Sequence, residues 1–372
     1  MGGLSDIEAR AALSRLVEPG DLEMGQLLAE LGAERVLGQI RAGTLRGRRL
    51  AHYRARLGSL DAATDLAMAQ RVEARVVVPG SPEWPSALDD LGPARPIALW
   101  VRGPAELAGL VRRAVSVVGA RACTAYGEHV AAGIGAGLGD RGWTVVSGAA
   151  FGIDAAAHRG ALAVEGPTVA VLACGIDLAY PSAHENLLGR VRESGLVLSE
   201  LPPGCRPSKP RFLTRNRIIA ALGRGTVVVE AALRSGAANT AGQAVDLSRE
   251  VMAVPGPVTS AMSAGCHELL RTKGAHLVTD AADVLDIVSP LGVDDSPPRR
   301  GEAQPHDDLD DLHLQVLEGL PLRRPVGPAS VARVAGVDIP SVLRCLGLLS
   351  ARGLAEMVDG GWRKAHVRRG GP

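Results

Sequence analysis

The chain has 372 residues, which is too long for one ordinary hydrophobic core, so its length predicts two or three domains. The 41 lysines and arginines nearly balance the 40 aspartates and glutamates, and a net charge of +1 excludes a protein that is basic throughout. Any anion-binding surface must therefore be local. Hydrophobic residues make up 46% of the chain and aromatic residues only 2%, so aliphatic side chains must build the core.

The five cysteines are scattered and form no CxxC pair, which favours a reducing, cytoplasmic environment over a disulfide framework or a zinc site. The N-terminus lacks a charged segment followed by an apolar one, so we expect no signal peptide. No uninterrupted apolar run reaches the roughly 18 residues of a membrane span. Together these features predict a cytoplasmic protein without a membrane span.

Residues 1–68 are expected to be all-helical. Apolar residues recur at helical spacing in 11–17 and 27–31, and the pairs Pro19-Gly20 and Gly32-Ala33 break the pattern. We expect either a small bundle of helix–turn–helix units, like a SAM or helix-hairpin-helix domain, or a helical cap on the next domain.

Residues 69–289 predict a Rossmann-like, doubly wound parallel sheet of the α/β class. Short apolar runs alternate with helical stretches, which is typical of a parallel sheet covered by helices on both faces. Two earlier runs, Arg75–Pro79 and Ile97–Arg102, predict additional edge strands. The other predicted strands are Ala114–Gly119, Trp143–Gly148, Thr168–Ala173, Leu196–Glu200, Thr226–Ala231 and Glu250–Gly256, and the predicted helices cover 125–141, 154–165, 184–194, 213–223 and 238–249.

The remaining residues predict a linker and a small C-terminal domain. Residues 290–312 are rich in proline and acidic side chains, which indicates a solvated linker. In 313–368, three helical stretches precede Asp359-Gly360-Gly361, a hairpin signal between two short β-runs. Three helices followed by a hairpin are typical of a winged-helix domain.

A basic window lies between Leu201 and Val229, where six cations occur without any aspartate or glutamate. Such a stripe suggests a phosphate backbone, and Phe212 within it suggests a base that stacks. The alternative for Arg215 and Arg217 is a solvated helix end. The six cations are Arg206, Lys209, Arg211, Arg215, Arg217 and Arg224.

Three loops are expected at the carboxyl ends of the strands, where open α/β sheets bind their ligands. Arg121 follows one strand and would face either a ligand or solvent on a surface turn. The next loop carries Gly148 and Gly152, which let the backbone approach an anion closely, and Phe151 between them. The third loop opens a helix that could bind phosphate through its N–H groups, or is a plain βα connection; its residues are Ser235, Gly236 and Thr240.

Carboxylates near the same strand ends leave two interpretations open. Asp154 and His158 are one helical turn apart and form either an acid–base or metal pair, or a helix cap with a local ion pair. Glu200 and Glu230 each end a strand and could perform acid–base chemistry, but we favour a role in orienting the arginines.

Two motif searches argue against a cofactor or a covalent catalyst. The run from Gly137 to Gly142 matches GxGxxG, but it ends a helix and precedes a strand, whereas the dinucleotide fingerprint follows a strand and opens a helix. No GxSxG nucleophile motif is present. We therefore expect no cofactor, and we also expect no metal.

In the order and spacing of these motifs, the chain resembles the DNA-processing protein A family, also called DprA or Smf. The resemblance covers residues 75–290 and includes the lead-in from Trp84-Pro85 to Gly103. It rests on Val118-Gly119-Ala120-Arg121, Ser147-Gly148, Gly152-Ile153-Asp154 with His158, Gly175, Tyr180-Pro181, Ser199-Glu200, Phe212, Arg215-Asn216-Arg217-Ile218-Ile219, Val229-Glu230-Ala231, Ser235-Gly236, Thr240-Ala241 and Pro255-Gly256.

The resemblance implies a cytoplasmic, non-enzymatic protein that binds single-stranded DNA, protects incoming DNA in natural transformation and helps to load RecA onto it. It also implies a homodimer. The residues expected to bind DNA are Arg121, Ser147, Gly148, Phe151, Gly152, Lys209, Arg211, Phe212, Arg215, Asn216, Arg217, Ser235, Gly236 and Thr240.

Two other functions remain open from the residues alone. Related folds include nucleotide hydrolases of the lonely-guy type, although their PGGxGTxxE motif is absent as such and Glu230 precedes its Ser-Gly loop. The basic C-terminal end is also compatible with a regulator that binds duplex DNA through the winged helix. The helical run Ile339–Ala351 is poor in polar residues, which favours a contact or auxiliary role over groove recognition.

Overall fold

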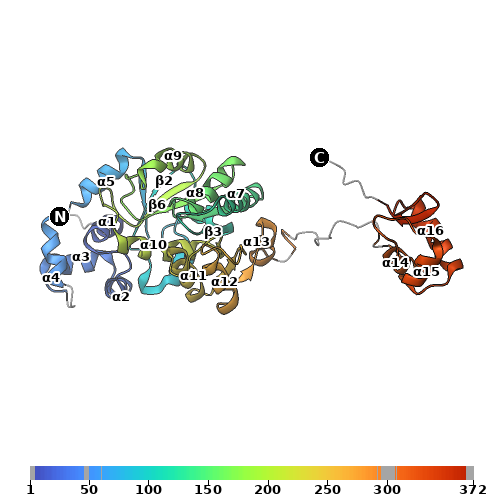
Figure 1. Cartoon of the computed structure of the whole chain (residues 1–372). Helices are drawn as coiled ribbons and strands as arrows, with labels where there is room; N and C mark the ends of the chain where they lie inside the picture. The colour runs from blue at the N-terminus through green and yellow to red at the C-terminus, as the bar shows by residue number, and fades with distance from the viewer. Residues whose placement is uncertain are drawn as a thin grey trace. The chain divides into compact units, whose positions relative to one another are not determined.

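A computed structural model describes residues 5–45, 50–59, 61–290, 292–294, 306 and 308–365. It separates into two compact units, Met1–Ser296 and Pro297–Pro372 (Figure 1). The first unit contains the N-terminal helices together with a nine-stranded sheet, and the second contains three helices and a hairpin. Each unit is described by itself.

The N-terminal segment is helical, as predicted, and its breaks follow the glycine and proline signals. Ser5 and Glu8 form a capping box at the start of the first helix, and Asp21 caps the second. Helix ends coincide with Gly32 and Gly43, which both have positive φ. The elements are α1 (Asp6–Leu16), α2 (Leu22–Leu31), α3 (Ala33–Ala42), α4 (Leu50–Arg56), η1 (Leu57–Ser59) and α5 (Ala62–Arg71).

These helices also bond to the segment that carries the sheet. Arg10 donates to the carbonyl of Ile97 at 3.2 Å. Arg15 pairs with Asp65 at 2.5 Å and donates to the carbonyl of Pro203 at 2.6 Å. Such contacts favour the helical cap over an independent bundle, while the predicted boundary between residues 68 and 69 stays a prediction.

The sheet has the order β1-β2-β6-β5-β4-β3-β7-β8-β9. From β6 to β9 all neighbours are parallel, whereas β1 pairs antiparallel with β2 and β2 antiparallel with β6. The predicted edge strands are therefore confirmed, and they make the sheet mixed. The strands are β1 (Ala74–Val77), β2 (Leu99–Arg102), β3 (Ala114–Val118), β4 (Thr144–Ser147), β5 (Thr168–Leu172), β6 (Leu196–Ser199), β7 (Gly225–Val228), β8 (Glu250–Ala253) and β9 (His276–Leu277).

Helices cover both faces of the sheet because side chains alternate along each strand. In β3, Val115 and Val117 join one core cluster with α7, α8 and α13, and Val118 joins another with α10, α11 and α12 (Figure 1). The helices are α7 (Ala125–Asp140), α8 (Ile153–Ala163), α9 (Glu185–Ser194), α10 (Lys209–Leu222), α11 (Gly236–Asp246), α12 (Ala264–Thr272) and α13 (Ala281–Val288). Short turns add η2 (Ser86–Ala94), α6 (Leu107–Leu110), η3 (Val111–Arg113) and η4 (Ser182–His184).

The strand order reverses beside β3. The chain passes from β3 through β4 and β5 to β6 in one direction, and then returns to place β7 on the other side of β3. The loops after β3 and β7 therefore separate at their carboxyl ends, which is where open α/β sheets bind ligands.

The C-terminal unit shows the predicted order of elements, α14 (Asp311–Glu318), α15 (Pro328–Ala335), α16 (Ile339–Ala351), β10 (Ala355–Val358) and β11 (Gly361–Lys364). The turn between the two strands uses Asp359 and Gly360, both with positive φ. Its core contains Val316, Val342 and Leu346. The winged-helix assignment stays a prediction, and most of the predicted linker 290–312 lies outside the described residues.

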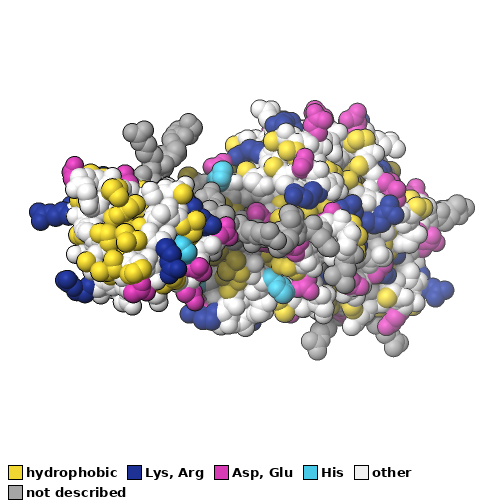
Figure 2. All heavy atoms as spheres, turned by 90° about the vertical axis from the view of Figure 1, so that its right-hand side faces the viewer, with side chains coloured by type: hydrophobic (Ala, Val, Ile, Leu, Met, Phe, Trp, Pro, Cys, Tyr) yellow, Lys and Arg dark blue, Asp and Glu magenta, His cyan; other side chains and the backbone are white. Residues whose placement is uncertain are grey.

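Hydrophobic side chains gather on one face of the smaller body in Figure 2. The exposed large hydrophobic residues of this unit include Val334, Ile339, Leu343 and Met357. Among the described residues, no single helix is long and apolar enough to cross a membrane; α15 and α16 pass that test only as a pair bent by 102°.

Candidate functional site

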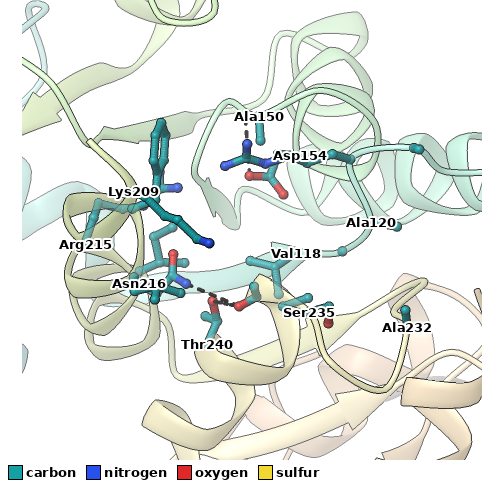
Figure 3. A pocket seen from close by; sticks show the side chains of 18 of the residues that line it. Val118, Ala120, Ala150, Asp154, Lys209, Arg215, Asn216, Ala232, Ser235 and Thr240 are labelled. Atoms are coloured by element: carbon teal, nitrogen blue, oxygen red, sulfur yellow. Dashed lines mark hydrogen bonds between the residues drawn. The ribbon is translucent and has the colours of Figure 1, made fainter. Parts of the chain in front are cut away.

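A cavity of about 740 Å³ opens at the carboxyl ends of β3 and β7 (Figure 3). A second space of about 70 Å³ shares Arg121, Tyr180 and Phe212 with it and is also lined by Gly148 and Phe151. Many of the predicted site residues line the larger cavity, and the sequence had placed them in three separate segments. They are Arg121, Lys209, Phe212, Arg215, Asn216, Ser235, Gly236 and Thr240.

Arg215 lies within the wall of the cavity, with only 7% of its surface exposed. Its Nη1 donates to the carbonyl of Gly148 at 3.0 Å and to that of Val171. A Cβ on Gly148 would lie 2.3 Å from this nitrogen, so any larger residue here would displace Arg215 or the loop. Burial lowers the pKa of Arg215 to about 10, which leaves the guanidinium charged at neutral pH. Arg215 thus fixes the Gly148 loop and places a positive charge behind it.

Asp154 lines the same cavity and was not predicted to bind a ligand. Its carboxylate accepts hydrogen bonds from the backbone N–H groups of Gly148 at 3.2 Å and Ala150 at 3.3 Å. Burial raises its pKa, while the charge of Arg215 acts in the opposite direction. The expectation that Asp154 caps α8 needs correction, because Gly152 is the N-cap and Asp154 lies inside the first turn.

An arginine and two aromatic rings form one rim of the cavity. The guanidinium carbon of Arg121 lies 4.9 Å from the ring centroid of Phe212, within the range of a cation–π contact. The ring of Tyr180 lies 5.4 Å from that of Phe212, tilted by 46°. The side chain of Arg121 is exposed and forms no ion pair with any residue in the described part of the chain. This rim therefore offers both a free cation and an accessible π-surface.

Phe151 lies on the neighbouring loop, and 48% of its surface is exposed. Its ring meets the edge of His184 at a centroid distance of 4.7 Å. Both phenylalanines of the chain thus border the same pair of spaces. Phe151 lies in a loop, as predicted, whereas Phe212 lies in the first turn of α10 and not ahead of the helix predicted over 213–223. Tyr180 completes the group; it belongs to the motif Tyr180-Pro181 of the family resemblance but was not among the residues expected to bind DNA.

Helices α10 and α11 supply the opposite wall. Lys209 begins α10, is exposed, and points into the cavity in Figure 3. Asn216 donates through Nδ2 to the carbonyl of Gly236 at 3.2 Å and to Oδ1 of Asn239 at 3.1 Å, which joins the two helices. Ser235 caps α11 by accepting from the N–H of Ala238 at 3.2 Å. The N-terminus of α11 therefore lies at the cavity, where helix N–H groups favour an anion.

Arg217 does not line the cavity, contrary to the prediction. It is 5% exposed, pairs with Glu200 at 2.7 Å and donates to the carbonyl of Ala94 at 2.8 Å. Two residues along a helix turn the side chain through about 200°, so Arg215 and Arg217 face opposite sides of α10. Arg217 therefore anchors η2 to α10, and the preferred role of Glu200, orienting an arginine, is supported.

Arg211 also lies away from the cavity. It pairs with Glu18 of the N-terminal segment at 2.9 Å and donates to the carbonyl of Arg206 at 2.7 Å. The hydrogen bonds from Arg211 to Glu18 raise the pKa of the guanidinium. Its position in the basic window placed it among the DNA contacts, but here it connects α10 to the N-terminal helices.

Ser147 and Gly152 support the site from behind. The hydroxyl of Ser147 is fully buried and donates to the carbonyl of Val117 at 2.6 Å. Gly152 has φ +75°, and a Cβ there would lie 2.3 Å from the carbonyl oxygen of Ala120. These two residues hold the loops after β3 and β4 together, and neither lines the cavities described above.

Glu230 and His158 also have structural partners. Glu230 accepts from the N–H of Thr124 at 2.8 Å and from its hydroxyl at 2.7 Å, so it fixes the start of α7, and it pairs with no arginine among the described residues. Nδ1 of His158 lies 2.7 Å from the hydroxyl of Thr168, and burial lowers the pKa of His158 to about 3. His158 is therefore neutral and bonded to Thr168 rather than to Asp154. Within the described ranges, no group of three or more potential ligands could hold a metal ion.

Comparisons with known proteins agree with this geometry. The family model described as DNA recombination-mediator protein A matches residues 75–289. A Mycobacterium tuberculosis protein with the name DNA processing protein DprA is 47% identical over 367 residues, covering 95% of this chain and 93% of its own length.

Two solved structures are also similar. The X-ray structure of DprA from Streptococcus pneumoniae aligns with a TM-score of 0.65 and 33% identity, over 77% of this chain and 99% of that one. DNA processing protein A from Helicobacter pylori, whose structure concerns its single-stranded DNA binding mode, aligns with a TM-score of 0.52 and 26% identity, over 57% of this chain and 94% of that one. Because the family model covers more than half of the chain and the mycobacterial relative nearly all of it, the chain belongs to the DNA recombination-mediator protein A (DprA/Smf) family.

Proposed function

We propose that this protein binds single-stranded DNA in the cavity at the carboxyl ends of β3 and β7. The observation that carries the proposal is the exposed guanidinium of Arg121 over the ring of Phe212, at the mouth of that cavity. A free cation beside an accessible aromatic ring matches the two parts of a single strand, a phosphate and a base with a π-face.

Each group of residues around the cavity has a different role in DNA binding. Arg121 and Lys209 neutralise phosphates, and the N-terminus of α11 adds N–H donors. Phe212, Tyr180 and Phe151 offer surfaces on which bases stack without strong sequence preference. Arg215 adds positive potential from behind the Gly148 loop but keeps its hydrogen bonds to the protein.

The role is one of binding rather than catalysis. Asp154 is occupied by two backbone N–H groups, and His158 is buried, neutral and bonded to Thr168. By family membership we further propose a cytoplasmic recombination mediator that acts as a homodimer, protects incoming DNA in transformation and helps to load RecA onto it. For the C-terminal unit we propose a winged-helix domain in an auxiliary, protein-contact role, because Ile339 and Leu343 of α16 are exposed.

Fluorescence anisotropy with a labelled poly-dT oligonucleotide across a salt series tests the site. Replacing Arg121 and Lys209 together by alanine should flatten the dependence of log K on log salt by about 1.4, since each single-strand phosphate contact contributes about 0.7. The matched control is Arg271→Ala, which removes an exposed arginine paired with Glu268 at 3.0 Å and should leave the slope unchanged. An unchanged slope in the double variant would place the DNA elsewhere.

A further inference from the structure

Three neighbouring strands each have an arginine just before their first residue. Arg224 and Arg249 lie directly before β7 and β8, and Arg112 lies two residues before β3, separated from it by Arg113. These strands are adjacent and parallel, so their amino ends meet at one edge of the sheet, opposite to the edge that holds the proposed DNA site. Arg224 belongs to the basic window of the sequence, yet the proposed DNA site makes no use of it.

The three arginines line a cavity of about 390 Å³ at this edge, together with Asp90 and Ser86 of η2. Gly223 forms part of its wall, and a Cβ there would lie 2.5 Å from the hydroxyl oxygen of Ser116. The backbone at Gly223 therefore packs closely against β3. This contact fixes the position of the neighbouring Arg224 backbone.

Positive charge in this cavity exceeds the negative charge that faces it. Arg249 pairs with Asp90 at 2.6 Å. Arg112 and Arg224 are exposed, and neither forms an ion pair within the part of the chain that the structure describes; Nε of Arg224 donates only to the backbone carbonyl of Arg112 at 3.0 Å. Of the residues that line this cavity, three are arginines and one, Asp90, is a carboxylate.

One donor in this cluster also lacks an acceptor. Nε of Arg249 is buried and has no hydrogen-bond partner among the described residues. A buried N–H without an acceptor costs about 1–3 kcal/mol, and the cost is larger for a charged group.

Helix ends and a tryptophan give these arginines a second possible role. Arg224 and Arg249 follow the C-termini of α10 and α11, where cations are favourable, and the guanidinium carbon of Arg224 lies 5.8 Å from the ring centroid of Trp143. Neither interaction needs Arg112 or requires a cavity between the side chains. Helix capping and the contact with Trp143 therefore do not account for all three arginines of the cluster.

We propose that the cavity lined by Arg112, Arg224 and Arg249 is a second anion site that binds a phosphate group. Guanidinium groups bind phosphate through paired, charge-assisted hydrogen bonds, and three arginines line this cavity. The phosphate group could belong either to a free phosphate compound or to the backbone of a DNA strand, and the two sources give different results in the test below.

Isothermal titration with inorganic pyrophosphate tests the site on the full chain. The reference protein carries Arg121→Ala and Lys209→Ala, so that the proposed DNA site contributes little to binding. Adding Arg112→Ala and Arg224→Ala should weaken pyrophosphate binding about a hundredfold, because each charge-assisted contact contributes about tenfold. Adding Arg112→Lys and Arg224→Lys instead should retain more of the affinity, since the charges remain.

Salt dependence of single-stranded DNA binding then identifies the source of the phosphate. With Arg112→Ala and Arg224→Ala alone, a slope flattened by about 1.4 indicates two contacts to a DNA backbone. An unchanged slope together with lost pyrophosphate binding indicates a free phosphate compound. If neither measurement changes while the thermal melt shows a folded protein, the proposal is overturned; if the alanine pair does not fold, the glutamine pair replaces it. Because the proposed DNA site is tested by Arg121 and Lys209, the two proposals can fail separately.

Discussion

At the carboxyl edge of the sheet, the arginines of α10 have used most of their donors inside the protein, whereas at the amino edge two arginines remain exposed without an ion pair to any described residue. Arg215 holds the Gly148 loop and Arg217 holds Glu200. Arg112 and Arg224 share only one hydrogen bond, to a backbone carbonyl. The comparison teaches that an arginine-rich segment does not by itself mark a DNA contact, because buried arginines can be committed to structure.

Aromatic side chains distinguish the two edges further. At the carboxyl edge, Arg121 lies over Phe212, and Tyr180 and Phe151 border the same spaces. At the amino edge, the aromatic partner is Trp143, which is fully buried. Only the carboxyl edge therefore offers a base a ring on which to stack, and we assign it the nucleic-acid site.

The largest expected effect is the loss of stability when the buried ion pair between Arg217 and Glu200 is broken. Arg217→Ala leaves Glu200 as a buried, unpaired carboxylate, and such a change typically destabilises a protein by about 3–5 kcal/mol. Urea denaturation measures the loss of unfolding free energy. The matched control is Arg249→Ala, whose partner Asp90 is exposed and which should cost far less. Equal losses in the two variants would show that burial adds nothing to the contribution of the Arg217–Glu200 pair.

An intermediate effect is expected at Gly148. A Cβ there would overlap the guanidinium of Arg215, so Gly148→Ala must displace the arginine or the loop, at a cost of about 1–3 kcal/mol. We expect lower stability in urea and weaker single-stranded DNA binding in anisotropy. The control is Gly133→Ala in α7, where no atom would contact the new Cβ and helix propensity predicts a gain of up to about 1 kcal/mol. Wild-type stability and affinity in Gly148→Ala would show that Arg215 is not locked to the loop.

An effect of similar size, but on DNA binding alone and not on stability, is expected from the stacking surface. Phe212→Ala should weaken single-stranded DNA binding by about 1–3 kcal/mol if one base stacks on the ring, and it should leave the salt slope nearly unchanged because no charge is lost. Phe212→Tyr keeps the ring and should bind like the wild type. Anisotropy across a salt series separates the contribution of stacking from that of charge. A loss of affinity that appears as a change in the slope of log K against log salt, and not as a constant offset, would contradict stacking.

Much of the fold could be predicted because its strands are short, continuous apolar runs between helical stretches. The exceptions have physical reasons: β9 consists of two exposed residues, His276 and Leu277, and so carries no apolar pattern. Helix α12 precedes this weak strand and α13 follows it, and neither helix was predicted from the sequence. The regular alternation of strand and helix is lost in this region.

The site was predicted less completely than the fold. Loop glycines and phenylalanines were recognisable because few residue types fit a tight turn or an aromatic rim. The position of Arg217 was wrong because the linear count of charges ignored that residues two apart face opposite sides of a helix. The amino-edge cluster could not be seen at all, since Arg112, Arg224 and Arg249 meet only after β3, β7 and β8 are placed side by side.

Photocrosslinking tests the central claim most directly. A single-stranded oligonucleotide containing 4-thiothymidine is bound to the full chain and irradiated, and the modified peptides are identified by mass spectrometry. Stacking at the carboxyl edge predicts adducts in the peptides that hold Phe212, Tyr180 or Phe151, and their loss in Arg121→Ala/Lys209→Ala. Adducts confined to the C-terminal unit, or unaffected by that double variant, would contradict the assignment of the cavity as the DNA site.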